Sequence, residues 1–86
     1  MATYSIQIKK SAQKEIKSLP SSDKQRIIAK IYTLAKNPRG PDSKKLSGQE
    51  KYRVRVGMYR ILYEIHDIIL VIIIVRVAHR QVMKTI

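Results

Sequence analysis

The sequence predicts an α+β domain, with helices in its first half and most of its strands in the second. Between residues 11 and 36 apolar residues recur every third or fourth position, which is typical of amphipathic helices. From residue 51 to residue 65 they alternate with charged residues, as in half-buried strands. The apolar run Ile68 to Val75 adds a strand buried on both faces. A chain of 86 residues has room for one core, so we expect a single domain over residues 1–86.

The first element expected is a strand over Thr3–Lys9, because its apolar residues alternate with polar ones. Ser11 can cap a short helix, which Pro20 ends. Ser22 and Gln25 form a capping-box pattern, so we expect the second helix to begin there.

The second helix is expected to close at Asn37-Pro38, and the segment from there to Gly48 is predicted to be a loop because it holds Gly40 and Pro41. Three strands should follow, joined by turns at Gly57-Met58 and His66-Asp67, the last running from Ile68 to about Ala78. We therefore expect the N-terminal strand, a two-helix hairpin and a three-stranded antiparallel meander. These would form one sheet with both helices on one face and the other face partly open and basic.

Charge is the most informative feature of the composition. Eighteen Lys and Arg stand against six Asp and Glu, a net charge of +12, which exceeds what solubility alone requires. Nucleic acid, an acidic protein or an anionic membrane would each explain it. The apolar run is too short to cross a membrane, and neither a targeting segment nor cysteine is seen. We expect a cytoplasmic protein with no membrane partner.

The basic residues of the second half are expected to gather on one face of the sheet. Alternation puts Lys51, Arg53 and Arg55 on the same side of their strand, about 7 Å apart. Arg60 follows on the adjacent strand. Further cations come from the loop and from the end of the last strand: Lys44, Lys45, Arg80 and Lys84, with His79 beside them. Arginine's planar fork suits phosphate, so the predicted partner is a polyanion, most simply RNA.

Several chemistries find no support in the sequence. The two histidines lie thirteen residues apart with no metal-binding spacing around them, and clustered carboxylates are missing. RNA cleavage needs no metal, since the 2′-hydroxyl is a built-in nucleophile, but the protein must move protons. Arginine is a poor proton acceptor, so we expect His79 in this role, with Lys51 in reserve. His66, in a predicted turn, is expected to be an ordinary surface histidine.

An ordered set of segments resembles the RelE/ParE toxin superfamily over nearly the whole chain. The segments are Tyr4–Ile8, Lys45–Gly48, Tyr52–Gly57, Tyr59–Tyr63 and Val77–Arg80. The resemblance implies a toxin of a type II toxin–antitoxin system that needs no cofactor. RelE-type members cleave mRNA on the ribosome without metal, and ParE-type members inhibit DNA gyrase.

The resemblance also implies roles and partners. Arg53 and Arg55 match the basic catalytic positions, Arg60 the phosphate-holding arginine and Arg80 the arginine after the last strand. The implied partners are an acidic RelB-like antitoxin, mRNA on the ribosome, and operator DNA only as the toxin–antitoxin complex. The tail, residues 81–86, lacks the tyrosine that RelE-type chains commonly carry there. A RelE-type endoribonuclease is the leading interpretation, and a gyrase inhibitor and a catalytically silent homologue are the alternatives.

Overall fold

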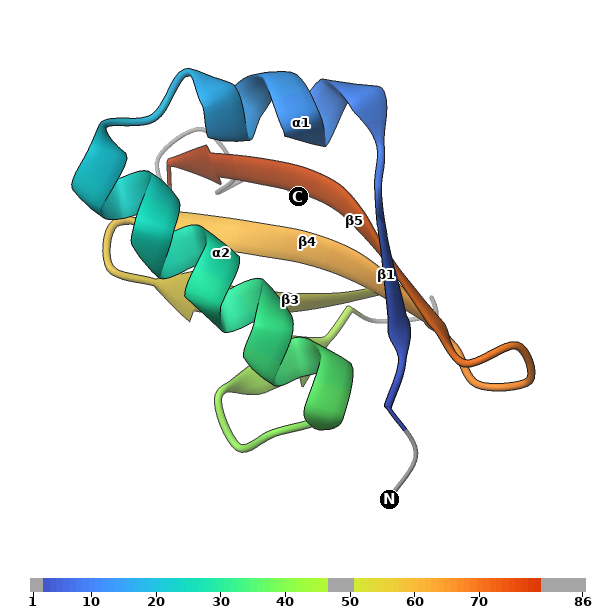
Figure 1. The fold of residues 1–86 in the computed structure, drawn as a ribbon. Helices are drawn as coiled ribbons and strands as arrows, with labels where there is room; N and C mark the ends of the chain where they lie inside the picture. The colour runs from blue at the N-terminus through green and yellow to red at the C-terminus, as the bar shows by residue number, and fades with distance from the viewer. Residues whose placement is uncertain (1–2, 47–50, 80–86) are drawn as a thin grey trace.

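The computed structural model describes residues 3–46 and 51–79. Two helices and five strands follow one another along the described chain (Figure 1). In chain order they are β1 (Ser5–Ile8), α1 (Lys10–Lys17), α2 (Ser21–Lys36), β2 (Ser43–Lys45), β3 (Lys51–Val56), β4 (Tyr59–His66) and β5 (Val71–His79). No helix in these described ranges has the length and apolar character needed to cross a bilayer.

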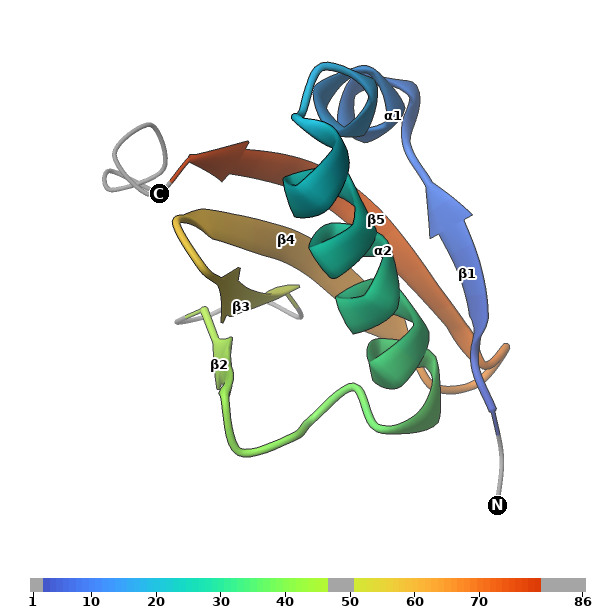
Figure 2. The ribbon, with the colours of Figure 1, turned by 60° about the vertical axis from the view of Figure 1, so that its left-hand side comes forward.

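The strands form one mixed sheet in the order β1-β5-β4-β3-β2. β1 pairs with β5 in parallel, whereas β5, β4, β3 and β2 are joined by antiparallel pairs. Both helices lie on one face of this sheet (Figures 1 and 2). The α+β class and the one-sided helical layer are therefore as predicted. The short strand β2 was not, because its three residues lie in the segment expected to be a loop.

Both helices begin without the side-chain caps that the sequence suggested. Ser11 lies inside α1, and Ser22 lies inside α2. Neither helix has a side-chain hydrogen bond at its N-cap. The carbonyl of Pro20 starts α2 instead, accepting a hydrogen bond from the Lys24 N–H at 2.8 Å. The expected capping box is therefore wrong, because the N-cap residue is Pro20, two residues before Ser22, and its side chain cannot accept a hydrogen bond.

The core lies between the helices and the sheet. Tyr63, Ile61 and Ile72 are fully buried in the sheet, and Ile27 of α2 packs into the same cluster. Complete burial of such a side chain stabilises the fold by roughly 1.5–3 kcal/mol. The apolar alternation of β3 and β4 is therefore what orients their charged residues to the opposite face.

The turn between β4 and β5 is longer than the sequence suggested. The last strand begins at Val71, not at Ile68. Ile68 is fully exposed, Ile69 is 66% exposed, and Leu70 has a positive φ of 53°. Three apolar residues predicted to be buried in the strand therefore form the tip of a hairpin.

A β-bulge interrupts β5 and changes which of its residues face the helices. Tyr63 pairs with Ile74, but Leu62 pairs with Arg76, so Val75 is an extra residue on β5. Glu15 of α1 occupies the strand edge beside the bulge. Its carboxylate accepts the Val77 N–H at 2.8 Å and the Arg76 Nε–H at 3.2 Å. Up to Ile74 the even-numbered residues of β5 face the helices, and from Val77 onward the odd-numbered residues do.

Candidate nucleic-acid interface

Four cations from three strands share the sheet face opposite the helices. Arg53 and Arg55 alternate along β3 with buried Tyr52 and Val54. Arg60 of β4 lies directly opposite Arg55. Lys44 of β2 lies directly opposite Arg53. Directly opposed residues point to the same side of a sheet, so the predicted grouping of Arg53, Arg55 and Arg60 is present.

These cations surround a shallow depression. Its volume is about 310 Å³, and it lies beside the end of β2, which pairs with only the middle of β3. An open, cationic hollow of this kind accommodates an anionic group and the atoms next to it. The lining residues are Asp42, Lys44, Arg53, Val54, Arg55 and Arg60.

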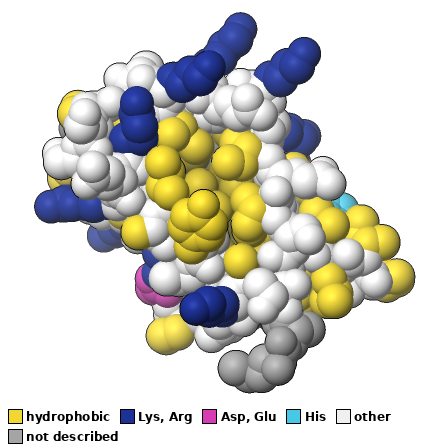
Figure 3. Space-filling model, viewed as in Figure 1, with side chains coloured by type: hydrophobic (Ala, Val, Ile, Leu, Met, Phe, Trp, Pro, Cys, Tyr) yellow, Lys and Arg dark blue, Asp and Glu magenta, His cyan; other side chains and the backbone are white. Residues whose placement is uncertain are grey.

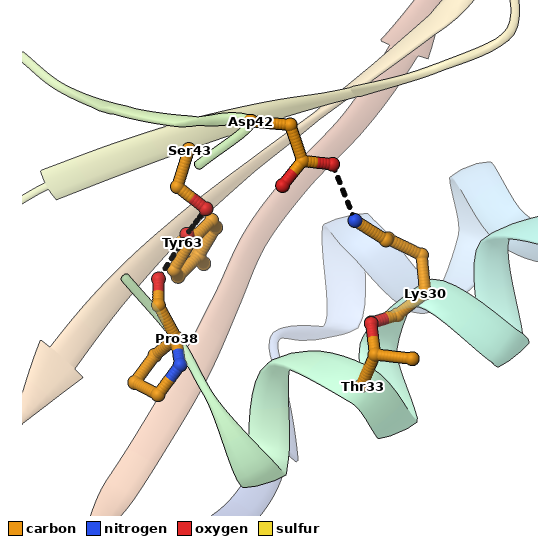
Figure 4. A network of polar contacts seen from close by, with 6 residues as sticks. All are labelled: Lys30, Thr33, Pro38, Asp42, Ser43 and Tyr63. Atoms are coloured by element: carbon orange, nitrogen blue, oxygen red, sulfur yellow. Dashed lines mark hydrogen bonds and ion pairs between the residues drawn. The ribbon is translucent and has the colours of Figure 1, made fainter. Parts of the chain in front are cut away.

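Asp42 was not among the residues that the sequence singled out. Its carboxylate Oδ2 accepts a hydrogen bond from Lys30 Nζ of α2 at 2.5 Å (Figure 4). The hydrogen bond from Lys30 holds the pKa of Asp42 below its usual range. The depression therefore contains one ionised carboxylate among its cations. Sequence offered only a weak signal for it, an acid just ahead of two lysines.

The segment that carries Asp42 is fixed from both sides. Tyr63 donates a hydrogen bond to the Pro38 carbonyl at 2.6 Å and is 2.8 Å from Ser43 Oγ (Figure 4). Burial raises the pKa of this phenol, so it remains a donor. Lys30 ties the same segment to α2. The wall of the depression is thus pinned to the helix layer and to the core of the sheet.

His79 does not lie with the arginines. It pairs with Tyr59, and its ring contacts the edge of the Tyr59 ring at a centroid distance of 5.8 Å. Tyr59 in turn donates to Asp23 of α2 at 3.2 Å, which places this pair on the helix side. Ala78 is the residue opposite Arg60. The expectation that His79 shares the arginine face is wrong, because the bulge reverses the alternation that would have put it there.

The other predicted residues are spread more widely. Lys51, at the far end of β3, lies opposite Glu64 of β4 in the sheet. Glu64 Oε1 is 3.0 Å from His66 Nε2. Lys45 pairs with Tyr52 and so has the opposite parity from Arg53. Arg80 and Lys84 lie outside the described residues. The described site is therefore narrower than the predicted one.

The arginine face is also less open than the sequence suggested. Leu62, opposite Arg53, and Ala78, opposite Arg60, are 7% and 9% exposed. Leu46 and Val75 pack against them to form a second, small apolar cluster. The cations thus border an apolar patch, and the face is not uniformly basic.

A second surface lies on the helix side of the molecule. An apolar groove of about 340 Å³ runs between β1 and α2 and includes Ile28 and Tyr32, which are 39% and 68% exposed. The space-filling view shows apolar side chains gathered there, with Lys and Arg standing around them (Figure 3). Ile6, Ile8 and Ile31 complete its lining.

The fold and the grouped cations define a class, a small α+β protein with a cationic depression on the sheet face that the helices leave uncovered. The described residues contain no cluster of His, Cys, Asp and Glu able to hold a metal ion. A family model for the ParE toxin of type II toxin–antitoxin systems matches residues 6–83. The chain belongs to the RelE/ParE superfamily of toxins.

Individual relatives agree with this assignment. A Methanocaldococcus jannaschii protein named for the RelE toxins, RelE1, is 33% identical over 82 residues, which cover 91% of each chain. A chain of the archaeal RelE–RelB complex from Pyrococcus horikoshii superposes with a TM-score of 0.82 at 31% identity, covering 91% of this chain and 96% of its own. A chain of the RelBE2 toxin–antitoxin complex from Mycobacterium tuberculosis gives 0.83 at 26% identity, covering 93% and 94%.

Proposed function

We propose that this chain is a cytoplasmic endoribonuclease that cleaves mRNA on the ribosome and thereby inhibits translation. The observation that carries the proposal is the convergence of Arg53, Arg55 and Arg60 around one depression. Guanidinium groups on adjacent strands can hold a phosphodiester and offset the charge that develops on it during reaction. Arg80 is proposed to join them, as the family pattern implies.

The reaction would follow the chemistry of RNA itself. The 2′-oxygen loses its proton and bonds to phosphorus, the bond from phosphorus to the 5′-oxygen breaks, and the 5′-oxygen takes up a proton. The products are a 2′,3′-cyclic phosphate and a 5′-hydroxyl. No metal enters this scheme, since the arginines supply the positive charge.

The test is cleavage of ribosome-bound mRNA by the purified chain, with the ends of the fragments mapped. We expect new 5′-hydroxyl ends and upstream fragments that end in a 2′,3′-cyclic phosphate. The double substitution Arg53→Ala with Arg60→Ala should abolish them. The matched control is Lys10→Ala with Lys14→Ala, which removes the same charge from α1. Equal loss of cleavage in both double variants would show that Arg53 and Arg60 act only through the net charge of the protein.

Inhibition of DNA gyrase is the second candidate, because the matching family model is that of the ParE toxins. Supercoiling of a relaxed plasmid by gyrase separates the two. Inhibition of supercoiling, with mRNA left intact on translating ribosomes, would replace the nuclease proposal. A chain that does neither while binding an antitoxin would be a silent homologue.

The proposed partner is an acidic antitoxin, as in the RelE–RelB complexes of relatives. The groove beside α2 offers it apolar contacts, and the surrounding lysines and arginines complement its charge (Figure 3). The complex, and not the free chain, is proposed to bind operator DNA. Ile28→Asp, at an exposed position, should weaken binding of a RelB-like antitoxin, and Arg53→Ala should leave it nearly unchanged. The opposite ranking would move the antitoxin to the arginine face.

A further inference from the structure

A carboxylate on the wall of an anion-binding depression needs an explanation. Asp42 lines the same hollow as Arg53, Arg55 and Arg60. Its negative charge would repel a phosphate held by those arginines, and Lys30 offsets that repulsion only in part. A site that served only to hold phosphate would be better without Asp42. The carboxylate is half exposed and open to a ligand, since its side chain is 51% exposed.

The orientation of the carboxylate limits what it can bind. One oxygen faces Lys30, and the other points away from it (Figure 4). An ionised carboxylate accepts hydrogen bonds and donates none. Its ligand must therefore carry a donor, and that donor must lie beside the phosphate that the arginines hold.

In RNA the ribose 2′-hydroxyl meets both conditions, because it is a hydrogen-bond donor on the carbon next to the one that carries the 3′-phosphate. DNA has no such group, so contact with the 2′-hydroxyl distinguishes the two polymers. We infer that Asp42 accepts a hydrogen bond from the 2′-hydroxyl and makes the depression selective for RNA. The inference rests on the proposed function, because it takes RNA as the substrate. Lys30 is then a counter-charge to the carboxylate and takes no part in the contact with the ribose.

The competing explanation is purely mechanical. The Lys30–Asp42 ion pair also ties the segment before β2 to α2. If that were its whole purpose, replacing either partner would have the same effect on the ratio of RNA to DNA affinity, although the two changes shift the net charge in opposite directions. If Asp42 contacts the ribose, replacing it should change the ratio of RNA to DNA affinity, and replacing Lys30 should largely spare that ratio.

The experiment measures binding of a short single-stranded RNA and of its DNA counterpart by fluorescence anisotropy at one fixed low salt concentration. Three variants are compared with the wild type. Asp42→Ala removes the carboxylate, and Lys30→Ala breaks the ion pair but keeps the carboxylate. Asp23→Ala makes the same change in net charge on the helix side, where Asp23 accepts from Tyr59. Thermal unfolding of each variant establishes that it is folded.

The wild type should prefer RNA by about tenfold, near the lower end for a hydrogen bond to a charged group. In Asp42→Ala the preference should fall below about twofold, and DNA should bind more tightly than to the wild type because the repulsion is gone. The other two variants should keep the wild-type ratio. If Asp42→Ala does not fold, Asp42→Asn takes its place, and its neutral amide should lower the ratio in the same direction.

A wild type without preference for RNA, or an Asp42 variant that keeps the wild-type preference, would overturn the inference. Equal losses of preference in the Asp42 and Lys30 variants would establish the mechanical explanation instead. Cleavage of ribosome-bound mRNA by the wild type is assayed in parallel. Absence of cleavage counts against the proposed function alone, because the affinity ratio is measured without any reaction.

Discussion

Arg39 and Asp67 form a bidentate ion pair at the base of the β4–β5 hairpin. Arg39 Nη1 donates to Asp67 Oδ1 at 3.1 Å and Nη2 donates to Oδ2 at 2.8 Å. Tyr4 donates to Oδ1 at 2.7 Å, and Arg39 Nε donates to Tyr52 at 3.2 Å. Two segments far apart in sequence, before β1 and after α2, thus meet at one carboxylate. Arg39 and Tyr4 together hold the pKa of Asp67 at about 2.

This pair predicts how stability depends on pH. The pKa of Asp67 is lower in the folded protein than its ordinary value of 3.8. Its contribution is therefore fully present above pH 3.8 and is lost as the pH falls towards 2. Melting temperatures of the wild type and Asp67→Asn should differ most near neutral pH and converge near pH 2. Both side chains are largely exposed, so the difference should also shrink in high salt. A difference that stays constant from pH 7 to pH 2 would exclude this ion pair as its source.

Removal of the Tyr63 hydroxyl is expected to lower the free energy of unfolding. Its hydroxyl donates to the Pro38 carbonyl and lies within hydrogen-bond distance of Ser43 Oγ, and its side chain is fully buried. Tyr63→Phe removes the hydroxyl and leaves those partners short of a hydrogen bond, at a cost of about 1–3 kcal/mol. Urea unfolding measures this loss. Tyr32→Phe is the matched control, because the exposed Tyr32 should tolerate the change. Equal stability of the two variants would contradict the role given to this network.

The sequence was sufficient to predict the arginine face of β3 and β4. Regular alternation places Arg53 and Arg60 on the face of the sheet away from the buried Val54 and Ile61, and nothing interrupts the pairing of β3 with β4. His79 could not be placed the same way. If β5 were regular, Ile72 and Ile74 would fix the parity of the strand, and His79 would point towards the arginines.

The bulge that reverses this parity depends on a contact between distant residues. Glu15 of α1 receives the Val77 N–H and Arg76, and a local pattern does not reveal that pairing. The one hint is Arg76, which would face the helices in a regular strand. The sequence did not predict Asp42 as a site residue for a similar reason, because only the folded chain brings Lys30 and the arginines close to it.

Leu70 predicts a substitution that stabilises the hairpin. Its φ of 53° lies in the left-handed region, which costs a non-glycine residue roughly 1–2 kcal/mol. Leu70→Gly should relieve this strain, at the cost of the buried part of a side chain that is 40% exposed and of the conformational entropy that glycine loses on folding. We expect a net gain of at most about 1 kcal/mol in the free energy of unfolding. Ile69→Gly, at a neighbouring position without a positive φ, should destabilise the protein or leave it unchanged. A loss of stability in Leu70→Gly would show that the leucine side chain matters more than its backbone conformation.

Arg55 and Arg60 predict a conflict between stability and binding. They lie directly opposite each other on β3 and β4, and like charges in this position destabilise a sheet. Arg55→Gln removes the repulsion and keeps most of the side chain, so the free energy of unfolding should rise by about a few tenths of a kcal/mol. The same change should weaken binding of single-stranded RNA, and the slope of log affinity against log salt should fall by about 0.7, the value for one phosphate contact.

The matched control is Lys14→Gln, which removes one charge from the exposed surface of α1. Because Lys14 lies far from the depression, RNA binding in this variant should stay close to the wild type. Opposite signs for stability and affinity in Arg55→Gln alone would mean that the close approach of the two arginines persists because it serves binding. An Arg55 variant that is less stable than the wild type, or that binds RNA as the wild type does, would show that this pair is ordinary surface charge.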